Sequence, residues 1–389
     1  MTTLSFLSYE HHSTAHIQLL AQELRYRGVM PWVDKLPGGF KAGDHSEQEA
    51  RRVINEDASE LVLFLTPEML DSHFIRTIEI PQALYRKAVD PAFRIVVASP
   101  SYGFGAMKDL TKTHFDIDLT SAHGYAKRDD ETIEVFVRRV ATEITTVRVG
   151  ALDPDSACLS ISINTYERMP RGGEALYFDA TDALAGDVTR TDVWQGLLDG
   201  LQSTKRAMSE RLGRPALTIN GSKHLTGAFI AGRVFNQYPL SIRQKDDHWR
   251  SSGETVDQLP VSTTYRPGPL SNRSLFVEFA TGHKPVSQGV DRVLESADIA
   301  PGGRLTILPT NGRMNVEDSL SRSLAHHVYS QIDRVSSIRA FDEIHLFVSA
   351  PQATIMTLAH LFHGMPEVHF YEWTDAGYIC SIVVPHRLG

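Results

Sequence analysis

The first 148 residues alternate between strand-like and helix-like hydrophobic patterns. Two near-continuous apolar runs, 59–67 (SELVLFLTP) and 93–100 (FRIVVASP), are typical of central parallel strands that are covered on both faces. Shorter strand-like runs lie at 3–9 and 29–34, and helical patterns lie at 16–28, 46–58 and 129–144. This alternation predicts an α/β domain with a parallel sheet of five strands.

A segment without periodicity separates this part from the rest of the chain. Residues 147–157 (VRVGALDPDSA) are rich in Gly, Pro and Asp, so we predict one domain over 1–148 and a second over 157–389. In the second part the order strand, Gly/Ser/Pro turn, helix, strand recurs at 215–244, 274–310 and 343–373. These βαβ units predict two similar Rossmann-like halves.

One stretch of the first domain raises a question of chemistry. In SHFIRTIEIPQAL, residues 72–84, Ile75 and Ile78 belong to the apolar stripe of a predicted helix, and Glu79 lies beside that stripe, four residues after Ile75. A glutamate here can be a first-turn acid that the helix dipole favours. It can also be a catalytic carboxylate at the mouth of a nucleotide pocket. These residues by themselves leave both interpretations open.

Composition narrows the class of ligand. The 389 residues include 39 Lys+Arg and 47 Asp+Glu, a formal net charge of −8. Long nucleic acids are therefore poor partners, because they need a positive field, whereas helix N-termini can hold a small nucleotide. Cys158 and Cys380 form no CxxC pair, and the sequence shows no signal-peptide pattern and no apolar run near the roughly 20 residues of a membrane span. We expect a cytoplasmic protein that does not bind membranes.

Three ordered motifs of the first domain resemble a Toll/interleukin-1 receptor (TIR) domain. They are FLSYEHH at 6–12, GVMPWVDKLPGGFKAGD at 28–44, and ELVLFLTPEMLDSHFIRTIEIPQAL at 60–84. The resemblance covers about residues 1–148 and implies a flavodoxin-like parallel sheet. Many prokaryotic TIR domains are NAD+ glycohydrolases, which cleave the nicotinamide–ribose bond and release ADP-ribose or its cyclic form. By this resemblance Glu79 is the catalytic carboxylate.

The chemistry suits an acid in a mostly apolar wall. Departure of nicotinamide leaves positive charge on the ribose, which a nearby carboxylate stabilises more strongly where the dielectric is low. The reaction needs no metal and no second cofactor. The candidate NAD-binding residues are Ser8 and Tyr9 after the first strand, Lys41 and Asp44 in the glycine-rich loop, and Ser72 and Phe74 before the glutamate.

The sequence departs from the TIR pattern near Glu79. Phe74 and Ile75 stand where the family usually has tryptophan and cysteine, and one extra residue separates Ser72 from Glu79. Glu68 is therefore a rival for the catalytic role. Other TIR domains are adaptors that bind partner TIR domains and cleave nothing, so a non-catalytic signalling scaffold is the alternative function.

The second domain resembles SAVED, a sensor domain fused to effectors in prokaryotic anti-phage (CBASS) systems. The stretches that carry this resemblance lie at 220–235, 246–249, 343–362 and 368–373. It implies two fused CARF-type Rossmann halves that bind a cyclic oligonucleotide made by a cognate nucleotidyltransferase. Cyclic tri-adenylate is the first choice of ligand, although the residues leave ring size and bases open.

Candidate ligand-binding residues of the second domain follow predicted strands. Gly221 and Ser222 open a helix whose amides can point at a phosphate, and Lys223 and His224 would lie on the rim. Base stacking is expected from Trp249 and Trp373. The remaining candidates are Thr281, Gly282, Asn311, Arg313, Ser349 and Pro351.

The combination implies an enzyme that is silent until its ligand arrives. Ligand binding would drive ordered self-assembly, and head-to-tail packing that does not close would give filaments. The loop 37–44, with three glycines, is the expected moving part of the TIR active site. The histidines at 123, 224, 248, 326 and 327 occur in neither HExxH nor Cys-x-x-Cys spacing, so we predict no metal site.

Overall fold

The computed structural model describes residues 4–34, 46–120, 123–166, 173–185, 188–244, 247–282, 286–297 and 300–387. The chain forms two compact units. The first unit comprises Met1–Asp153 and Arg171–Phe178, and the second comprises Pro154–Pro170 and Asp179–Gly389. The predicted boundary segment 147–157 contains the change at Asp153, although helix α5 (Ile133–Gly150) extends into that segment. Strand β7 (Leu176–Asp179) straddles the division, whereas we had expected it wholly in the second domain.

The first unit is built on a parallel sheet. Its strands are β1 (Leu4–Ser8), β2 (Met30–Trp32), β3 (Ala58–Phe64), β4 (Arg94–Ser99) and β5 (Gly124–Ala126). They lie in the order β2-β1-β3-β4-β5, and every neighbouring pair is parallel. The strand order reverses between β1 and β3. In doubly wound sheets of this order, ligands bind at that switch point, beyond the carboxyl ends of the strands.

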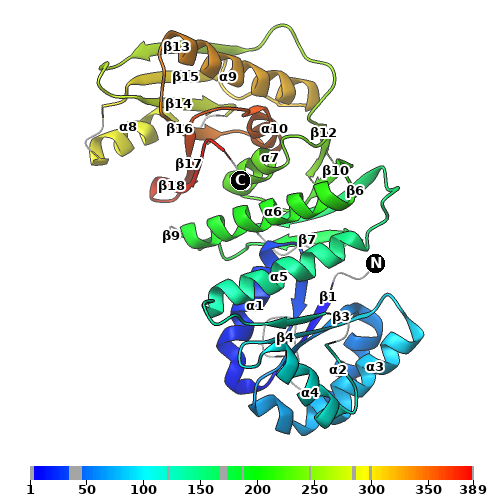
Figure 1. The fold of residues 1–389 in the computed structure, drawn as a ribbon. Helices are drawn as coiled ribbons and strands as arrows, with labels where there is room; N and C mark the ends of the chain where they lie inside the picture. The colour runs from blue at the N-terminus through cyan, green and yellow to red at the C-terminus, as the bar shows by residue number, and fades with distance from the viewer. Residues whose placement is uncertain are drawn as a thin grey trace. The chain divides into compact units, whose positions relative to one another are not determined.

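Helices cover both faces of this sheet (Figure 1). Helices α1 (Thr14–Tyr26) and α5 pack on one face, and α2 (Ser46–Arg52), α3 (Ile80–Val89) and α4 (Phe104–Phe115) pack on the other. Successive residues of β3 point to opposite cores, with Leu61 and Leu63 in one and Val62 and Phe64 in the other. Burial on both sides explains why the strand sequence is apolar throughout.

Two predicted helices contain a wider turn. In 46–58 and in 72–84 the structure has π-helical turns at Val53–Asp57 and Ile75–Glu79. In the second of these the Ile80 amide donates to the Ile75 carbonyl, five residues back. A π-turn holds one residue more than an α-turn closed by an i to i−4 bond. Short 3₁₀ turns lie at His11–Ser13 and Glu68–Asp71.

The second unit contains two α/β halves. The first half has β6 (Cys158–Asn164), β10 (Ala216–Asn220) and β11 (Leu240–Gln244) parallel to one another, β12 (Asp247–Arg250) antiparallel, the small hairpin β8 (Leu184–Ala185) and β9 (Val188–Thr189), and helices α6 (Thr191–Arg211) and α7 (Leu225–Val234). In the units β6–α6–β10 and β10–α7–β11 a helix connects two parallel strands, as expected for an α/β layer.

The second half has a sheet of six strands in the order β13-β15-β14-β16-β17-β18. Its strands are β13 (Val261–Pro267), β14 (Ser274–Ala280), β15 (Gly303–Pro309), β16 (Glu343–Ser349), β17 (Glu367–Thr374) and β18 (Gly377–Val384), and its helices are α8 (Val286–Ala297), α9 (Asp318–Ile338) and α10 (Gln352–Leu361). The three βαβ units predicted at 215–244, 274–310 and 343–373 are all present.

The helices α7 and α10 hold the two halves together, and they lie side by side in Figure 1. All residues of α7 from Thr226 to Val234 are buried, as are those of α10 from Ala353 to Ala359. At the closest approach, a Cβ atom on Gly232 would lie 2.1 Å from the carbonyl oxygen of Met356. The contact therefore requires a residue without a side chain on α7.

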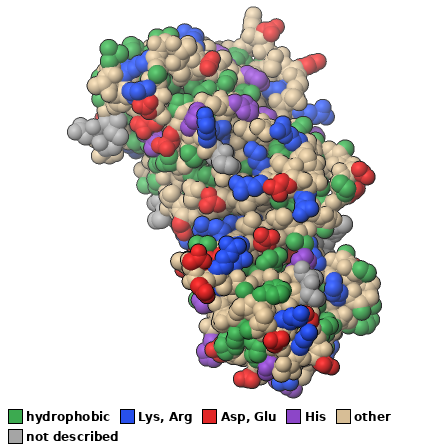
Figure 2. Space-filling view, in the orientation of Figure 1, with side chains coloured by type: hydrophobic (Ala, Val, Ile, Leu, Met, Phe, Trp, Pro, Cys, Tyr) green, Lys and Arg blue, Asp and Glu red, His purple; other side chains and the backbone are tan. Residues whose placement is uncertain are grey.

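Surface charge agrees with the argument from composition. On the face shown in Figure 2, Lys and Arg side chains are interspersed with Asp and Glu side chains in both units. Within the described ranges, no helix combines the length and apolar character needed to cross a bilayer.

The Gly232 contact predicts a specific sensitivity to added volume. Gly232→Ala should destabilise the second unit by about 1–3 kcal/mol, because a methyl group must displace the α10 backbone. Gly105→Ala in α4 is the matched control, since its added Cβ meets nothing within 4 Å. Calorimetric melting of the full chain measures both. Equal melting temperatures for the two variants would contradict the tight α7–α10 contact.

Candidate functional site

Glu79 lies at the switch point of the first sheet. It ends the π-turn and precedes α3, and only 8% of its surface is exposed. The hydroxyl of Ser8, the last residue of β1, donates to Glu79 Oε2 at 2.5 Å. Helical residues already begin at His73, and the Glu79 side chain caps no helix amide. The first-turn interpretation of this glutamate is therefore wrong.

Burial changes the acidity of Glu79. Loss of hydration raises the pKa of this carboxyl from its ordinary 4.5 to about 7, the hydrogen bond from Ser8 opposes the rise, and the nearby Asp34 carboxylate adds to it. Asp34 accepts a hydrogen bond of 2.7 Å from the hydroxyl of Tyr9. Burial and that bond raise the pKa of the Tyr9 phenol, so it remains a protonated donor. The site thus holds a carboxylic acid that titrates near neutrality.

A cavity of about 370 Å³ opens beside this carboxylate. Of the predicted NAD-binding residues, Tyr9, Ser72 and Phe74 line the cavity together with Glu79. Ser8 does not line it but donates a hydrogen bond to Glu79. Lys41, Asp44 and the rest of the loop 37–44 lie outside the described residues. The other lining residues are Leu7, Glu10, His11, Trp32, Asp34, Ser46 and Ile75.

The rival glutamate occupies a different environment. Glu68 is exposed at the start of a 3₁₀ turn, and it does not line the cavity. The π-turn at Ile75–Glu79 accounts for the extra residue between Ser72 and Glu79, because it takes up one residue within the helix. Both Ser72 and Glu79 can therefore face the same cavity.

Asp34 lies within the second TIR-like motif, at 28–44, but we had assigned it no role. Asp34 follows β2, as Tyr9 follows β1, so both lie beyond the carboxyl ends of neighbouring parallel strands. The strand order, which the sequence does not state, brings them within hydrogen-bonding distance. Trp32 also lines the cavity, and its ring stacks on Phe6 with centroids 4.6 Å apart.

In the second unit, a turn between β10 and α7 forms part of a polar edge. Gly221 has φ +96°, and a Cβ there would lie 2.4 Å from the Ile163 carbonyl oxygen, so the turn requires glycine. The carbonyl of Ser222 accepts hydrogen bonds from the amides of Thr165 and Tyr166, which follow β6. The carboxyl ends of β6 and β10 are thereby joined at one edge.

The predicted rim residues Lys223 and His224 differ in exposure. Lys223 is only 2% exposed, and its ammonium donates to the carbonyls of Asn220 and Gly221 at 2.8 and 2.7 Å. Burial lowers the pKa of Lys223 to about 7. It therefore stabilises the turn from inside and does not lie on the rim as expected.

His224 is partly exposed and belongs to an aromatic pair. Its ring lies 5.1 Å from that of Tyr166, and its amide donates to Thr165 Oγ1 at 2.7 Å. Burial lowers the pKa of His224, which favours the neutral ring. Tyr166 is 67% exposed and is therefore more accessible than its neighbour His224. Its place directly after a predicted strand was the available signal, and we had assigned it no role.

The second half contributes a matching edge. The Thr281 amide, after β14, donates to the Ser349 carbonyl at the end of β16, and the Thr281 carbonyl accepts from Met314, each at 2.9 Å. Asn311 and Arg313 are exposed in the same loop as Met314. The structure therefore brings together Thr281, Gly282, Ser349 and the loop that carries Asn311 and Arg313. Thr281 itself is buried.

Two hydrogen-bonded contacts connect the edges of the halves. Gln352, which follows Pro351 at the start of α10, donates from its side-chain amide to the Lys223 carbonyl. Glu372 of β17 accepts from the amide and the hydroxyl of Thr226, at 2.8 and 2.7 Å, and so supplies a negative charge at the start of α7. Both residues lay inside motifs that we quoted, but their partners are far away in the sequence.

The two predicted stacking tryptophans do not present open faces. Trp249 is 7% exposed on β12. Trp373 is partly buried, and its ring meets that of Tyr378 edge-on at 5.0 Å. In this conformation Trp249 is buried and Trp373 is partly exposed, so base stacking by these two rings stays a prediction.

Comparison with known proteins addresses the second unit. The family model described as "SMODS-associated and fused to various effectors sensor domain" (SAVED) matches residues 201–384. Residues 201–384 form a SAVED domain. The match begins within α6, so β6 and Tyr166 precede it, whereas we had expected the domain to begin at 157.

The relatives of this SAVED-containing chain include receptors. CD-NTase-associated protein 4 of an Acinetobacter species is 23% identical over 240 residues, which cover 59% of this chain and 48% of that protein. The chain thus spans about half the length of this curated relative. The Acinetobacter baumannii Cap4 SAVED/CARF-domain receptor has been solved with the cyclic trinucleotides 2'3'3'-cAAA and 3'3'3'-cAAA.

The receptor structures share the fold at low sequence identity. The first has a TM-score of 0.52 and 14% identity over 88% of this chain and 98% of its own. The second has a TM-score of 0.52 and 15% identity over 91% of this chain and 100% of its own. At this level of identity the likeness concerns the arrangement of helices and strands.

The shifted pKa of Glu79 predicts a pH-dependent effect on stability. The folded protein keeps the Glu79 proton between pH 4.5 and about 7, whereas the unfolded chain releases it, so this group's contribution falls as the pH rises through that window. Glu79→Gln removes the cost of ionisation. Relative to the wild type, this variant should gain more stability at pH 8 than at pH 5. The gain in the free energy of unfolding should differ between the two pH values by up to roughly 3 kcal/mol.

Urea unfolding at both pH values measures this difference. Glu68→Gln is the control, because Glu68 is exposed and its substitution should change stability equally at the two pH values. The same behaviour for both variants would show that Glu79 titrates as a solvated acid.

Proposed function

We propose that the first unit is a TIR-type NAD+ glycohydrolase that a cyclic oligonucleotide, bound by the SAVED-containing unit, activates within a CBASS anti-phage system. The observation that carries the proposal is the buried Glu79 beside a cavity of about 370 Å³ at the β1/β3 switch point. The flavodoxin-like strand order and the three TIR-like motifs support it.

The site suits cleavage of a bond to a cationic leaving group. The nicotinamide ring of NAD+ is positively charged, and its approach favours the ionised form of a carboxyl whose pKa is about 7. The resulting carboxylate would stabilise the charge that develops on the ribose. Ser8 holds one carboxylate oxygen in place, and the Phe74 and Trp32 side chains supply apolar wall to the cavity. The C–N bond to the ribose breaks, nicotinamide leaves, and water adds to the ribose carbon with loss of a proton, which gives ADP-ribose.

The ligand-binding edge suits a cyclic oligonucleotide. Amides at the start of α10 can bind phosphates, and the exposed Tyr166 with His224 offers aromatic surface to a base. The relative solved with cyclic trinucleotides makes a ring of three nucleotides, such as tri-adenylate, the preferred ligand. We propose that this ligand drives self-association and that neighbouring copies complete each active site. Moving the competent population from about 1% to 99% requires roughly 5.5 kcal/mol of differential affinity.

The alternative is a scaffold whose first unit recruits a partner and leaves NAD+ intact. It is favoured only by the replacement of the family's Trp–Cys pair with Phe74 and Ile75. Both of these side chains line the cavity, so the replacement keeps apolar side chains in this part of its wall.

Consumption of NAD+ with a panel of cyclic di-, tri- and tetranucleotides tests the proposal. We expect activity with a cyclic trinucleotide and a loss of at least about 100-fold in kcat/KM for Glu79→Gln, since a charge-stabilising group is removed. Glu68→Gln should keep wild-type activity. Activity without ligand would contradict activation by the sensor. If the ligand binds and no NAD+ is consumed, the scaffold is the better description.

Tyr166 provides a separate test of the sensor. Tyr166→Ala should weaken binding of cyclic tri-adenylate by about 10- to 100-fold, because a stacked base contributes roughly 1–3 kcal/mol. Tyr85→Ala, which removes a similarly exposed tyrosine from α3, should bind as the wild type does. Calorimetric titration measures the dissociation constants. Equal dissociation constants for the two variants would show that Tyr166 does not stack on a base of the ligand.

A further inference from the structure

The sequence Glu-x-His occurs twice at the amino ends of neighbouring strands. Glu343 and His345 begin β16, and Glu367 and His369 begin β17. The strands are parallel and in register, with Glu343 opposite Glu367 and His345 opposite His369. Because side chains alternate across a strand, all four belong to one face of the sheet. The two Glu-x-His sequences form one cluster only because the strands pair in this register.

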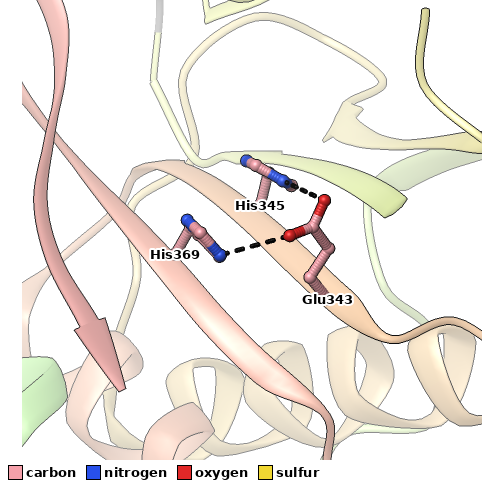
Figure 3. Close-up of side chains that lie close together, drawn as sticks. All are labelled: Glu343, His345 and His369. Carbon is pink, nitrogen blue, oxygen red and sulfur yellow. Dashed lines mark ion pairs between the residues drawn. The ribbon is translucent and has the colours of Figure 1, made fainter. Parts of the chain in front are cut away.

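The donor atoms of this cluster converge. Glu343 Oε1 lies 3.2 Å from His345 Nε2, and Glu343 Oε2 lies 3.4 Å from His369 Nε2. Figure 3 shows the Glu343 carboxylate directed at both imidazole rings. Ligand atoms of Glu343, His345 and His369 all lie within 4.8 Å of one another. Neighbouring ligands of a tetrahedral zinc ion, each about 2.1 Å from the metal, are about 3.4 Å apart.

His345 is oriented as a ligand before any metal arrives. It is 6% exposed, and among the described residues its Nε2 finds no hydrogen-bond partner of acceptable geometry. Its Nδ1 lies 3.0 Å from the hydroxyl of Tyr371. The ring also stacks between Phe276 at 4.3 Å and His369 at 4.5 Å. A hydrogen-bonded Nδ1 and a fixed ring plane are the support that metal-ligating histidines normally have.

We propose that Glu343, His345 and His369 bind a divalent transition metal, with Zn²⁺ as the best match, and that Glu367 completes the set. Glu367 Oε1 lies 3.1 Å from His369 Nε2, beside the three residues whose ligand atoms converge. Two carboxylates and two neutral imidazoles balance the charge of a divalent ion.

The position of the cluster indicates a structural role. It lies at the start of β16, whereas the ligand-binding edge lies at Ser349, the end of the same strand. At about 3.3 Å per residue the two are roughly 20 Å apart. Four protein ligands would leave no open position for a substrate, so the metal would join β16 to β17 and take no part in catalysis.

Metal titration of the tag-free, EDTA-dialysed full chain tests the site. We expect one equivalent of Zn²⁺ to bind and to raise the melting temperature of the wild type. Glu343→Gln and His369→Gln change two partly exposed ligands, with 39% and 20% exposed side chains, and should weaken binding at least tenfold. Circular dichroism of the metal-free variants checks that they remain folded. Co²⁺ should give the visible absorption of a tetrahedral complex.

His12→Gln is the matched control. His12 also forms an ion pair with a glutamate, Glu10, at 2.7 Å, but it lies outside the cluster and its side chain is 81% exposed. This variant should bind Zn²⁺ as the wild type does. The proposal is overturned if the wild type binds less than a stoichiometric amount, or if the two cluster variants retain wild-type affinity while folded. Cyclic-nucleotide binding is a separate measurement, so its failure would leave this test intact.

Discussion

Parallel strands place all their carboxyl ends at one edge of a sheet, and most of the chemistry of this protein depends on that constraint. Ser8, Tyr9 and Asp34 meet beside Glu79 because β1 and β2 are neighbours that point the same way. In the second unit the same rule gathers the residues after β6 and β10, and those after β14 and β16. Helices begin at these edges, and at α7 the amides of His224 and Thr226 donate to Thr165 and Glu372.

The elements could be predicted wherever burial is uniform along them. Runs such as 59–67 are apolar because both sheet faces are covered, and the repeated βαβ pattern follows from the same cause. The π-turns could not be predicted, because a helical pattern of apolar residues does not reveal one extra residue in a turn. The end of α5 was also missed, since its last turn contains Gly150 and leads into a Pro/Asp-rich segment.

The candidate sites were predictable to different degrees. The motif order singled out Glu79, but its burial and its bond from Ser8 depend on contacts across 71 residues of sequence. Lys223 was misplaced because a lysine in a glycine-containing turn usually reaches solvent, whereas here two carbonyls of its own turn hold it inside. The Glu-x-His pairs were visible in the sequence, yet only the register of β16 and β17 makes them one cluster.

The contact between α7 and α10 has a consequence for how a signal leaves the sensor. Gly232 rests on the α10 backbone, and Gln352 and Glu372 each bind the opposite half, so the two halves have little freedom to hinge against each other. A ligand held across both edges would meet a preorganised surface and spend little of its binding energy on closing it. Such an arrangement favours passing the signal outward, as new surface offered to another molecule, over hinging of the two halves.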